Sequence, residues 1–211
     1  ATSCSPTSRA RSRTRTTTCR SDRGARSIDE ASARAEAFVV RGAAVPGTVR
    51  HPDSPSPMAD RPVAFITGAS RGIGRAIALR LASTHRIVAA ARDRDRLDAV
   101  VREVEAAGGI GEALVLDVAD ADAVARTLAG CDADVLVHNA GVGVLKPLLE
   151  LAPAEWQRMI DVNVNALYHV SRALLPGMIA RGRGHVVIIG SIAGRSAFVG
   201  GAGYATTKHA V

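Results

Sequence analysis

The stretch TGASRGIG, at Thr67–Gly74, most constrains what this chain can fold into. An apolar run precedes it and an apolar-periodic segment follows it, which predicts a strand, a tight turn and the start of a helix. Gly68, Gly72 and Gly74 allow positive φ angles and a close approach of a ligand to the backbone. The unpaired N–H groups of the helix start suit a pyrophosphate. A glycine-rich turn alone also fits a plain tight connection, so the strand and helix around it carry this prediction.

After Arg61, short continuous apolar runs alternate with segments of helical periodicity. Uninterrupted apolar strands between helices are typical of a parallel sheet covered on both faces, so we expect an α/β fold: a doubly wound, Rossmann-like, three-layer sheet. In such a sheet the ligand crevice lies at the carboxyl ends of the strands. Strands are expected at 63–67, 86–91, 113–116, 134–138 and 185–189, and helices at 73–83, 93–107, 121–128, 154–180 and from about 203, with Pro176 as a kink or break.

Residues 1–57 form a segment rich in Ser, Thr, Arg and Pro that carries +5 of the net charge of +7. Such a segment buries too little apolar surface to offset its ordering entropy, so we expect it to be disordered, with any helix at 28–40 transient. Three interpretations stay open: a stretch upstream of a start at Met58, a transit peptide, or a basic arm for nucleic acid. Residues 58–211 are then the folded domain, for which nucleic acid is not an expected partner.

The cysteines and the hydropathy of the chain narrow the class of protein further. Cys4, Cys19 and Cys131 are odd in number and widely spaced, so they imply neither a disulfide framework nor a metal site. No apolar run approaches the roughly 18 residues of a membrane span. We therefore expect a cytoplasmic protein with no metal and no membrane segment.

Six motifs follow one another along residues 61–211, and together they resemble the short-chain dehydrogenase/reductase family. They are TGASRGIG itself, Leu116-Asp117-Val118, His138-Asn139-Ala140-Gly141 (with His where the family has Asn), Asp161-Val162-Asn163-Val164, Gly190-Ser191, and Tyr204 with Lys208 in Y-x-x-x-K. The resemblance implies a Rossmann-like oxidoreductase with Asn163, Ser191, Tyr204 and Lys208 as its catalytic residues.

The spacing of Tyr204 and Lys208 supports this chemistry, because residues four apart share one helix face. A free phenol has a pKa of about 10, and a neighbouring ammonium favours the phenolate. Tyr204 can then exchange the proton at the substrate oxygen while hydride moves at carbon. By resemblance, Lys208 also binds the nicotinamide ribose, Ser191 holds the substrate oxygen, and Asn163 anchors a water that links Lys208 to solvent.

The charge around the expected cofactor site favours NADP(H) over NAD(H). An NAD site usually has a carboxylate after the second strand, whereas this chain has Ala91 and Arg92 there and Arg71 in the turn. Arginine binds a 2′-phosphate through charge-assisted hydrogen bonds. Ser70 also fits a cap or turn role, and Asn139 a structural role that ties two strands together. The expected cofactor-binding residues are Gly68, Ser70, Arg71, Gly72, Ile73, Gly74, Arg92, Asp117, Val118, Asn139, Ala140, Gly141, Tyr204 and Lys208.

The chain departs from the family pattern at its end, three residues after Lys208. Family members continue through a sixth strand, a segment that covers the substrate and a seventh strand, so we expect an open sheet edge here. Two hypotheses about function are therefore open. The chain is either an NADP(H)-dependent oxidoreductase for a carbonyl or secondary alcohol, or an inactive truncated fragment that at most binds the dinucleotide. A third hypothesis is nucleic-acid binding through the basic arm. The resemblance also implies a small-molecule substrate and, for full-length relatives, a homo-oligomer.

Overall fold

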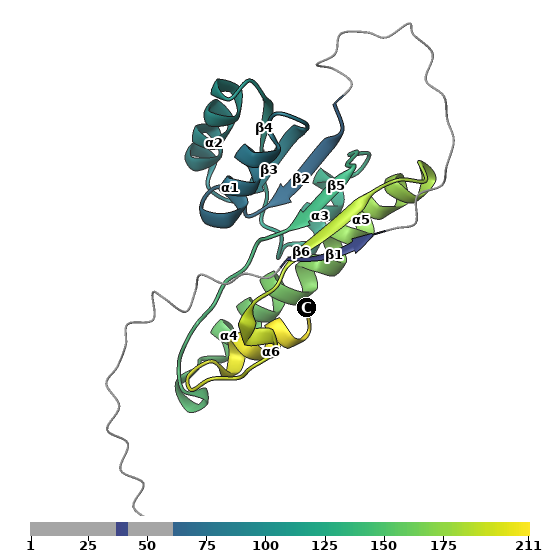
Figure 1. The fold of residues 1–211 in the computed structure, drawn as a ribbon. Coiled ribbons are helices and arrows are strands. Elements are labelled where there is room, and N and C mark those ends of the chain that lie inside the picture. Colours follow the sequence, from purple (N-terminus) through teal and green to yellow (C-terminus); the bar gives the residue numbers. More distant parts are fainter. Residues whose placement is uncertain (1–36, 42–60) are drawn as a thin grey trace, which may run out of the picture. The chain divides into compact units, whose positions relative to one another are not determined.

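A six-stranded sheet with helices on both faces is formed by the residues that the computed structural model describes, 37–41 and 61–211 (Figure 1). These elements belong to one unit, Arg34–Val211. The strand order is β1-β6-β5-β2-β3-β4, and β2 to β6 are mutually parallel. The strands are β1 (Ala37–Arg41), β2 (Val63–Thr67), β3 (Arg86–Ala91), β4 (Ile110–Val115), β5 (Val135–His138) and β6 (His185–Ile189). The predicted doubly wound parallel sheet is confirmed, and its order reverses between β2 and β5.

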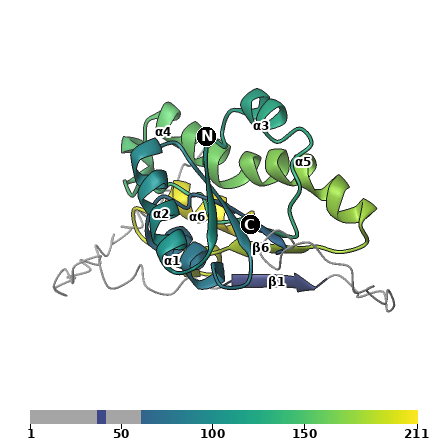
Figure 2. The ribbon, with the colours of Figure 1, turned by 90° about the horizontal axis from the view of Figure 1, so that it is seen from above.

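The two faces of the sheet are covered by different helices. The helices α1 (Gly72–Leu81) and α2 (Arg94–Ala106) cover one face, and α3 (Ala121–Thr127) and α5 (Ala166–Ala180) cover the other, where α3 and α5 contact each other (Figure 2). The remaining elements are the short 3₁₀ helices η2 (Leu148–Glu150) and η4 (Ile192–Gly194), the helices α4 (Pro153–Ile160) and α6 (Ala202–His209), and the π-helical turn η3 (Asp161–Asn165). No helix in the described part of the chain is long and apolar enough to cross a membrane.

Strand β2 shows why its apolar run is uninterrupted. Its side chains alternate between the two faces: Ala64 and Ile66 join the core under α1 and α2, and Phe65 joins the core under α3 and α5. All three are at most 1% exposed. A strand that is buried on both faces needs apolar residues at every position, which is the pattern that predicted a parallel sheet.

The long helical stretch predicted at 154–180 is divided in the structure. The N–H of Ala166 donates to the carbonyl of Asp161, which widens one turn into the π-helical segment η3 between α4 and α5. Pro176 lies inside α5, which continues to Ala180, so no break occurs there. The predicted limits of the other helices agree within two residues, whereas β4 begins at Ile110 rather than Ala113.

Strand β1 corrects two expectations about residues 37–41. They lie in the segment predicted to be disordered, with at most a transient helix, yet they pair with β6 in antiparallel register from Ala37↔Ile189 to Arg41↔His185. Phe and Val favour strands, and the edge of β6 offers unpaired backbone groups, so the β6 edge that was expected to be open is paired. The remainder of the predicted extension, and the boundary at Met58, lie outside the described residues.

Candidate active site

The glycine-rich turn after β2 is shaped by the residues that close on it. Gly68 and Gly72 have φ values of 67° and 56°, in the left-handed region that favours glycine. A Cβ added at Gly74 would lie 2.5 Å from both Asn139 Nδ2 and Gly68 O. At Gly68 it would lie 2.8 Å from the Cα of Ala140. The turn therefore packs directly on the residues that follow β5.

Asn139 and Thr67 join the ends of β2 and β5, where the strand order reverses. The Asn139 Nδ2 donates to Thr67 O at 2.9 Å and to Gly68 O at 3.1 Å. Thr67 Oγ1 accepts from the backbone N–H groups of Asn139 and Ala140, both at 3.0 Å, and donates to Val137 O. The predicted structural role of Asn139 is confirmed by these contacts, which fix the glycine turn beside the loop after β5.

The N-terminus of α1 suits an anion. Asp93 and Asp120 cap the N-termini of α2 and α3 with their side chains, whereas α1 has no side-chain cap and no acidic residue in its first turn. Its N-cap is Arg71, and a Cβ added at Gly72 would meet nothing within 4 Å. The uncapped helix dipole and free space above the turn fit the phosphates of a dinucleotide.

Ile73 lies at the start of α1 and differs from the other apolar residues of that helix. It is spaced to share a helix face with Ile77 and Leu81, but its side chain is 46% exposed. Ile77 and Leu81 do pack against the core. An exposed apolar side chain beside an uncapped helix start is consistent with the expected contact of Ile73 with a cofactor.

The expected cofactor-binding residues Arg92 and Asp117 lie after β3 and β4. No carboxylate follows Ala91 directly: Arg92 comes first, and the side chain of Asp93 accepts from Arg96 N as the cap of α2. Asp117 Oδ1 accepts from the backbone N–H of Ala119 at 3.0 Å, which shapes the turn after β4. Arg92 Nη1 lies 3.9 Å from Asp117 Oδ2, so two of the expected cofactor-binding residues, a cation and a carboxylate, lie side by side.

The π-helical turn η3 brings Asn163 into the predicted catalytic region. Asn163 is 1% exposed, and its Oδ1 accepts from Val142 N at 2.8 Å. Its Nδ2 donates to Val142 O at 2.8 Å and to Thr207 Oγ1 at 2.9 Å. Asn165, the other asparagine of the same turn, donates instead to the carboxylate of Asp161. Asn163 therefore joins η3, the loop after β5 and helix α6.

Tyr204 and Lys208 lie on α6 against the glycines that follow β5. A Cβ added at Gly143 would lie 3.1 Å from Tyr204 Cδ2, and one at Gly141 would lie 3.5 Å from Asn163 Oδ1 and 3.9 Å from Lys208 Nζ. The ammonium of Lys208 donates to Ile189 O at 2.9 Å. Burial lowers the pKa of Lys208 below its ordinary value of 10.5. The loop at 141–143 thus packs against three of the four predicted catalytic residues.

Ser191, the fourth, caps the short helix η4 at the end of β6. Its Oγ accepts from Ala193 N at 3.2 Å, and its side chain is partly exposed. Gly194 of the same turn contacts the backbone carbonyl of Lys208 so closely that a Cβ would not fit. The η4 turn and α6 are therefore packed together, which brings Ser191 to the same edge of the sheet as Lys208.

Sequence reasoning missed three residues that hold this region together. Gly143 makes room for the ring of Tyr204, Thr207 bonds Asn163 and the carbonyl of Tyr204, and Arg158 pairs with Asp117. The repeated glycine at 141 and 143 is a signal for close backbone packing that could have identified the first. Thr207 and Arg158 lie within helices as ordinary polar residues, and only the tertiary packing distinguishes them.

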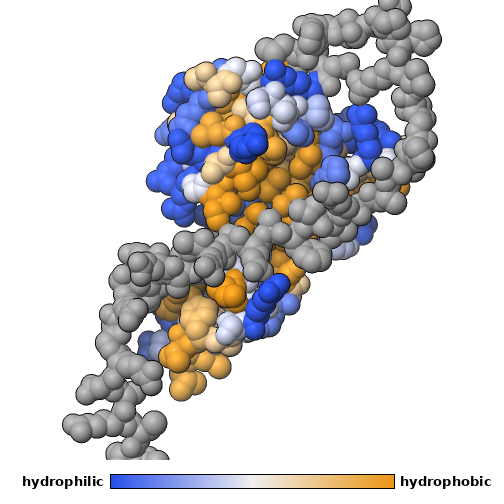
Figure 3. Space-filling view, in the orientation of Figure 1, coloured by the Kyte–Doolittle hydropathy of each residue, from blue (hydrophilic) through white to orange (hydrophobic). Residues whose placement is uncertain are grey.

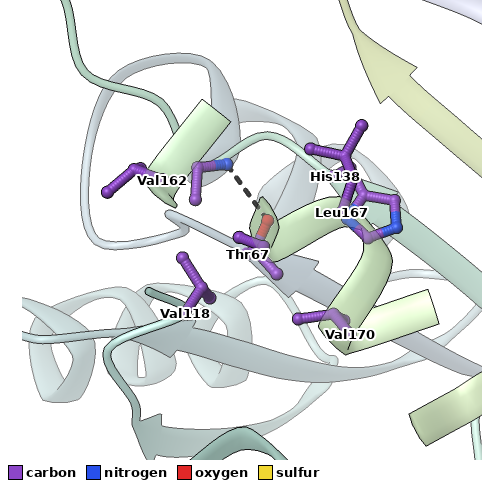
Figure 4. Close-up of a pocket in the computed structure, with 8 residues that line it drawn as sticks. Thr67, Val118, His138, Val162, Leu167 and Val170 are labelled. Atoms are coloured by element: carbon purple, nitrogen blue, oxygen red, sulfur yellow. Dashed lines mark hydrogen bonds between the residues drawn. The ribbon is translucent and has the colours of Figure 1, made fainter. Parts of the chain in front are cut away.

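His138 replaces the first Asn of the family motif and lies at the end of β5, 4% exposed. It lines a small pocket with Thr67, Val118, Val162 and α5, and Figure 4 shows the imidazole beside Leu167 and Val170. Its Nε2 lies 2.9 Å from Ser171 Oγ on α5, the polar partner that such burial requires. His138 therefore packs the sheet against α5.

His138 should make the stability of the protein fall in acid. Burial lowers the pKa of His138 from 6.5 to about 4, so between these values the unfolded chain binds a proton that the folded chain does not. The stability that the neutral His138 contributes is fully present above its pKa in the unfolded chain. It is lost as the pH falls from that pKa toward the lower pKa of the folded chain. Between pH 7 and pH 4.5 the free energy of unfolding should therefore fall in the wild type. We expect this fall to be about 2 kcal/mol smaller in His138→Asn. Urea unfolding at both pH values measures this difference, and equal losses would contradict it.

Comparisons with known proteins agree with this arrangement. The sequence profile of the short chain dehydrogenase family matches residues 62–211, and the chain belongs to this family. It is similar to the NADP-dependent 3-hydroxy acid dehydrogenase YdfG of Salmonella typhi, with 37% identity over 156 residues, 69% of this chain and 60% of the relative. It is 39% identical to the 3beta-hydroxysteroid dehydrogenase of Mediterraneibacter gnavus, covering 72% of this chain and 57% of that one. The chain thus spans about three fifths of the length of these relatives.

The chain is also similar to solved structures of short-chain oxidoreductases. A metagenomic short-chain oxidoreductase in complex with NADP matches with a TM-score of 0.68 and 46% identity, covering 71% of each chain. An actinorhodin polyketide ketoreductase with NADPH matches with a TM-score of 0.69 and 32% identity, covering 72% of this chain and 61% of that one. Within the residues described here, no group of three or more His, Cys, Asp or Glu side chains could hold a metal ion.

Proposed function

We propose that this chain is an NADP(H)-dependent oxidoreductase that interconverts a carbonyl compound and a secondary alcohol. One observation carries the proposal: Tyr204 and Lys208 of α6 pack against Gly143 and Gly141 of the loop after β5, and that loop is bonded to the glycine turn through Asn139. The pair proposed to exchange the proton and the turn proposed to bind the phosphates thus lie at one edge of the sheet. The NADP-dependent relative and the NADP-bound structures support the same cofactor.

The cofactor would lie along the carboxyl ends of the strands, with its pyrophosphate over the glycine turn. The N–H groups at the start of α1 would bind the pyrophosphate, with Ser70 and Ile73 beside it. Asp117 and Val118 would contact the adenine, and Arg71 and Arg92 the 2′-phosphate. Ala140 and Gly141 would lie along its path toward Tyr204 and Lys208. When bound, the nicotinamide supplies or accepts the hydride.

The remaining chemistry belongs to the side chains at the nicotinamide end. Tyr204 would give the proton to the substrate oxygen in reduction and take it back in oxidation. Lys208, whose ammonium is held by Ile189 O, would place a positive charge beside that phenol and bind the ribose. Ser191 would hold the substrate oxygen. Asn163, whose side chain is already bonded to Val142 and Thr207, would fix the loop and α6 against each other and anchor the water next to Lys208.

Apolar side chains are exposed on the loops beside this end of the sheet. Leu145, Leu148 and Leu149 lie in the segment before α4, and Phe198 and Val199 lie in the segment between η4 and α6. Figure 3 shows apolar surface on the part of the molecule where Figure 1 places α4 and α6. A small-molecule substrate with an apolar portion next to its carbonyl carbon fits such surroundings. The relatives named for a 3-hydroxy acid and a hydroxysteroid agree with a secondary alcohol as the substrate class.

Reversing the charge of Arg92 should change the choice of cofactor. In Arg92→Asp the 2′-phosphate loses a cation and meets a carboxylate, so we expect NADPH to bind about 10- to 100-fold more weakly while NADH binding is unchanged or stronger. Titration of both cofactors by fluorescence measures this change. Arg102→Asp on the exposed surface of α2 makes the same charge change outside the site and should leave both affinities as they are.

Two results would contradict the cofactor proposal. One is a wild-type chain that binds NADH more tightly than NADPH. The other is an Arg92→Asp variant whose ratio of NADPH to NADH affinity equals that of Arg102→Asp.

A further inference from the structure

Three charged side chains from distant parts of the chain meet at the adenine end of the proposed site. Arg92 follows β3, Asp117 follows β4 and Arg158 projects from α4. Arg158 Nη2 lies 3.1 Å from Asp117 Oδ2 and 3.4 Å from its Oδ1, and Arg92 Nη1 lies 3.9 Å from the same Oδ2. One carboxylate is therefore shared by two guanidinium groups, and of the two only Arg92 is among the proposed cofactor-binding residues.

The two arginines hold Asp117 unequally. Arg158 contacts both carboxylate oxygens, and its side chain is 36% exposed, as is that of Asp117. Arg92 is beyond hydrogen-bond distance from the carboxylate, and its side chain is 63% exposed. Arg158 is the fixed partner of Asp117, while Arg92 is loosely paired and free to turn toward a ligand.

We infer that Arg158 is a positioning residue that sets the preference for a 2′-phosphate by holding the carboxylate of Asp117. This inference rests on the proposed NADP(H) function. Asp117 is needed at the adenine, but its negative charge opposes a phosphate group nearby and competes with it for Arg92. Arg158 neutralises that charge from the side of α4, so Arg92 is left available for the phosphate.

The effect is specific to ligands that carry a 2′-phosphate. Without Arg158, Arg92 becomes the only cation within 4 Å of Asp117 among the ion pairs of the described residues, and a 2′-phosphate must break that pair to bind. A ligand with a free 2′-hydroxyl makes no demand on Arg92 and is not affected. Because Arg158 lies three residues before the π-helical turn η3, the same ion pair also ties the adenine loop to the helix that leads to Asn163.

A purely structural role for Arg158 predicts something different. If the pair only fastens α4 to the loop after β4, its removal lowers stability and weakens all adenine nucleotides equally. The ratio of the affinities for adenosine 2′,5′-bisphosphate and 5′-AMP separates the two roles, because these probes differ only in the 2′-phosphate.

Calorimetric titration of both probes into the full chain tests the inference. In Arg158→Met the ratio of the two affinities should fall about three- to fivefold, the size expected for a partly exposed ion pair. Arg158→Lys keeps the charge and should restore most of the ratio. In the Asp117→Asn background, where no carboxylate competes for Arg92, Arg158→Met should leave the ratio unchanged.

The outcomes distinguish the inference from the function on which it rests. A wild-type chain that binds both probes equally would overturn the NADP(H) proposal and the inference with it. A wild-type preference for the bisphosphate that persists in Arg158→Met would overturn the inference alone. The inference would also be overturned if Arg158→Met lowered the ratio of the two affinities as much in the Asp117→Asn background as in the wild type. Arg158 would then act on the phosphate without Asp117.

Discussion

Replacing Tyr204 with Phe should lower the rate of carbonyl reduction by about 100-fold or more, because the substrate oxygen loses its proton donor. The affinity for NADPH should change little, since the ring still packs against Gly143 and Lys208 keeps its bond to Ile189 O. Single-turnover oxidation of bound NADPH in the presence of a carbonyl substrate measures the first quantity. Fluorescence titration of NADPH measures the second.

The second tyrosine of the chain provides the matched control. Tyr168 lies on α5, is 59% exposed and accepts a hydrogen bond from Arg172 at 2.9 Å. Tyr168→Phe removes the same hydroxyl group from a surface position and should reduce at the wild-type rate. If Tyr204→Phe retains that rate as well, Tyr204 is not the proton donor.

Replacing Gly74 with Ala should destabilise the protein and abolish dinucleotide binding together. The added Cβ would lie 2.5 Å from Asn139 Nδ2 and from Gly68 O, in a turn that cannot open without breaking the bonds of Asn139 to Thr67 and Gly68. Overpacking and the loss of these partly buried hydrogen bonds together suggest a fall in the free energy of unfolding of about 3 kcal/mol. Urea unfolding measures the stability, and titration with adenosine 2′,5′-bisphosphate measures the binding.

Gly72 separates backbone strain from overpacking in the same turn. Its φ is 56°, but a Cβ there would meet nothing within 4 Å. Gly72→Ala should therefore cost only about 1 kcal/mol, the strain of a left-handed alanine. Equal losses of stability in the two variants would show that the contact between the turn and Asn139 is not what holds this region together.

Much of the sheet follows from the sequence because its physical causes are local. β2 and β3 are continuous apolar runs, and in a parallel sheet buried on both faces no other pattern fits those positions. The glycine turn was predictable for a related reason: Gly68 and Gly72 take positive φ, which few other residues tolerate. The location of the site at the carboxyl ends of the strands then followed from topology alone, because parallel strands all end at the same edge of the sheet.

What the sequence did not predict depends on tertiary contacts. The π-helical turn that buries Asn163 has no periodicity of its own, since it is one widened turn inside a helical pattern. The helical spacing of Ile73, Ile77 and Leu81 identifies a shared helix face, but it does not show that the side chain of Ile73 is left uncovered. Strand β1 lies in a segment of polar composition, and its five residues became a strand by pairing with β6, far along the chain.

The predicted site residues were identified by their motif positions, and the packing between them was not. The Y-x-x-x-K spacing put Tyr204 and Lys208 on one helix face, but nothing in it indicated that Gly141 and Gly143 would lie against them. Likewise, the charge pattern singled out Arg92 and Arg71, while Arg158 became relevant only because α4 places it on Asp117.

Transfer of deuterium to a carbonyl substrate from NADPH that carries deuterium at both C4 positions is the most direct test of the proposed function. Mass spectrometry of the alcohol formed by the full chain should find the label on the carbinol carbon. The label should be nearly absent from reactions with Tyr204→Phe and with labelled NADH at the same concentration. An alcohol without label from the wild-type chain, or label that forms as fast in Tyr204→Phe, would contradict the account.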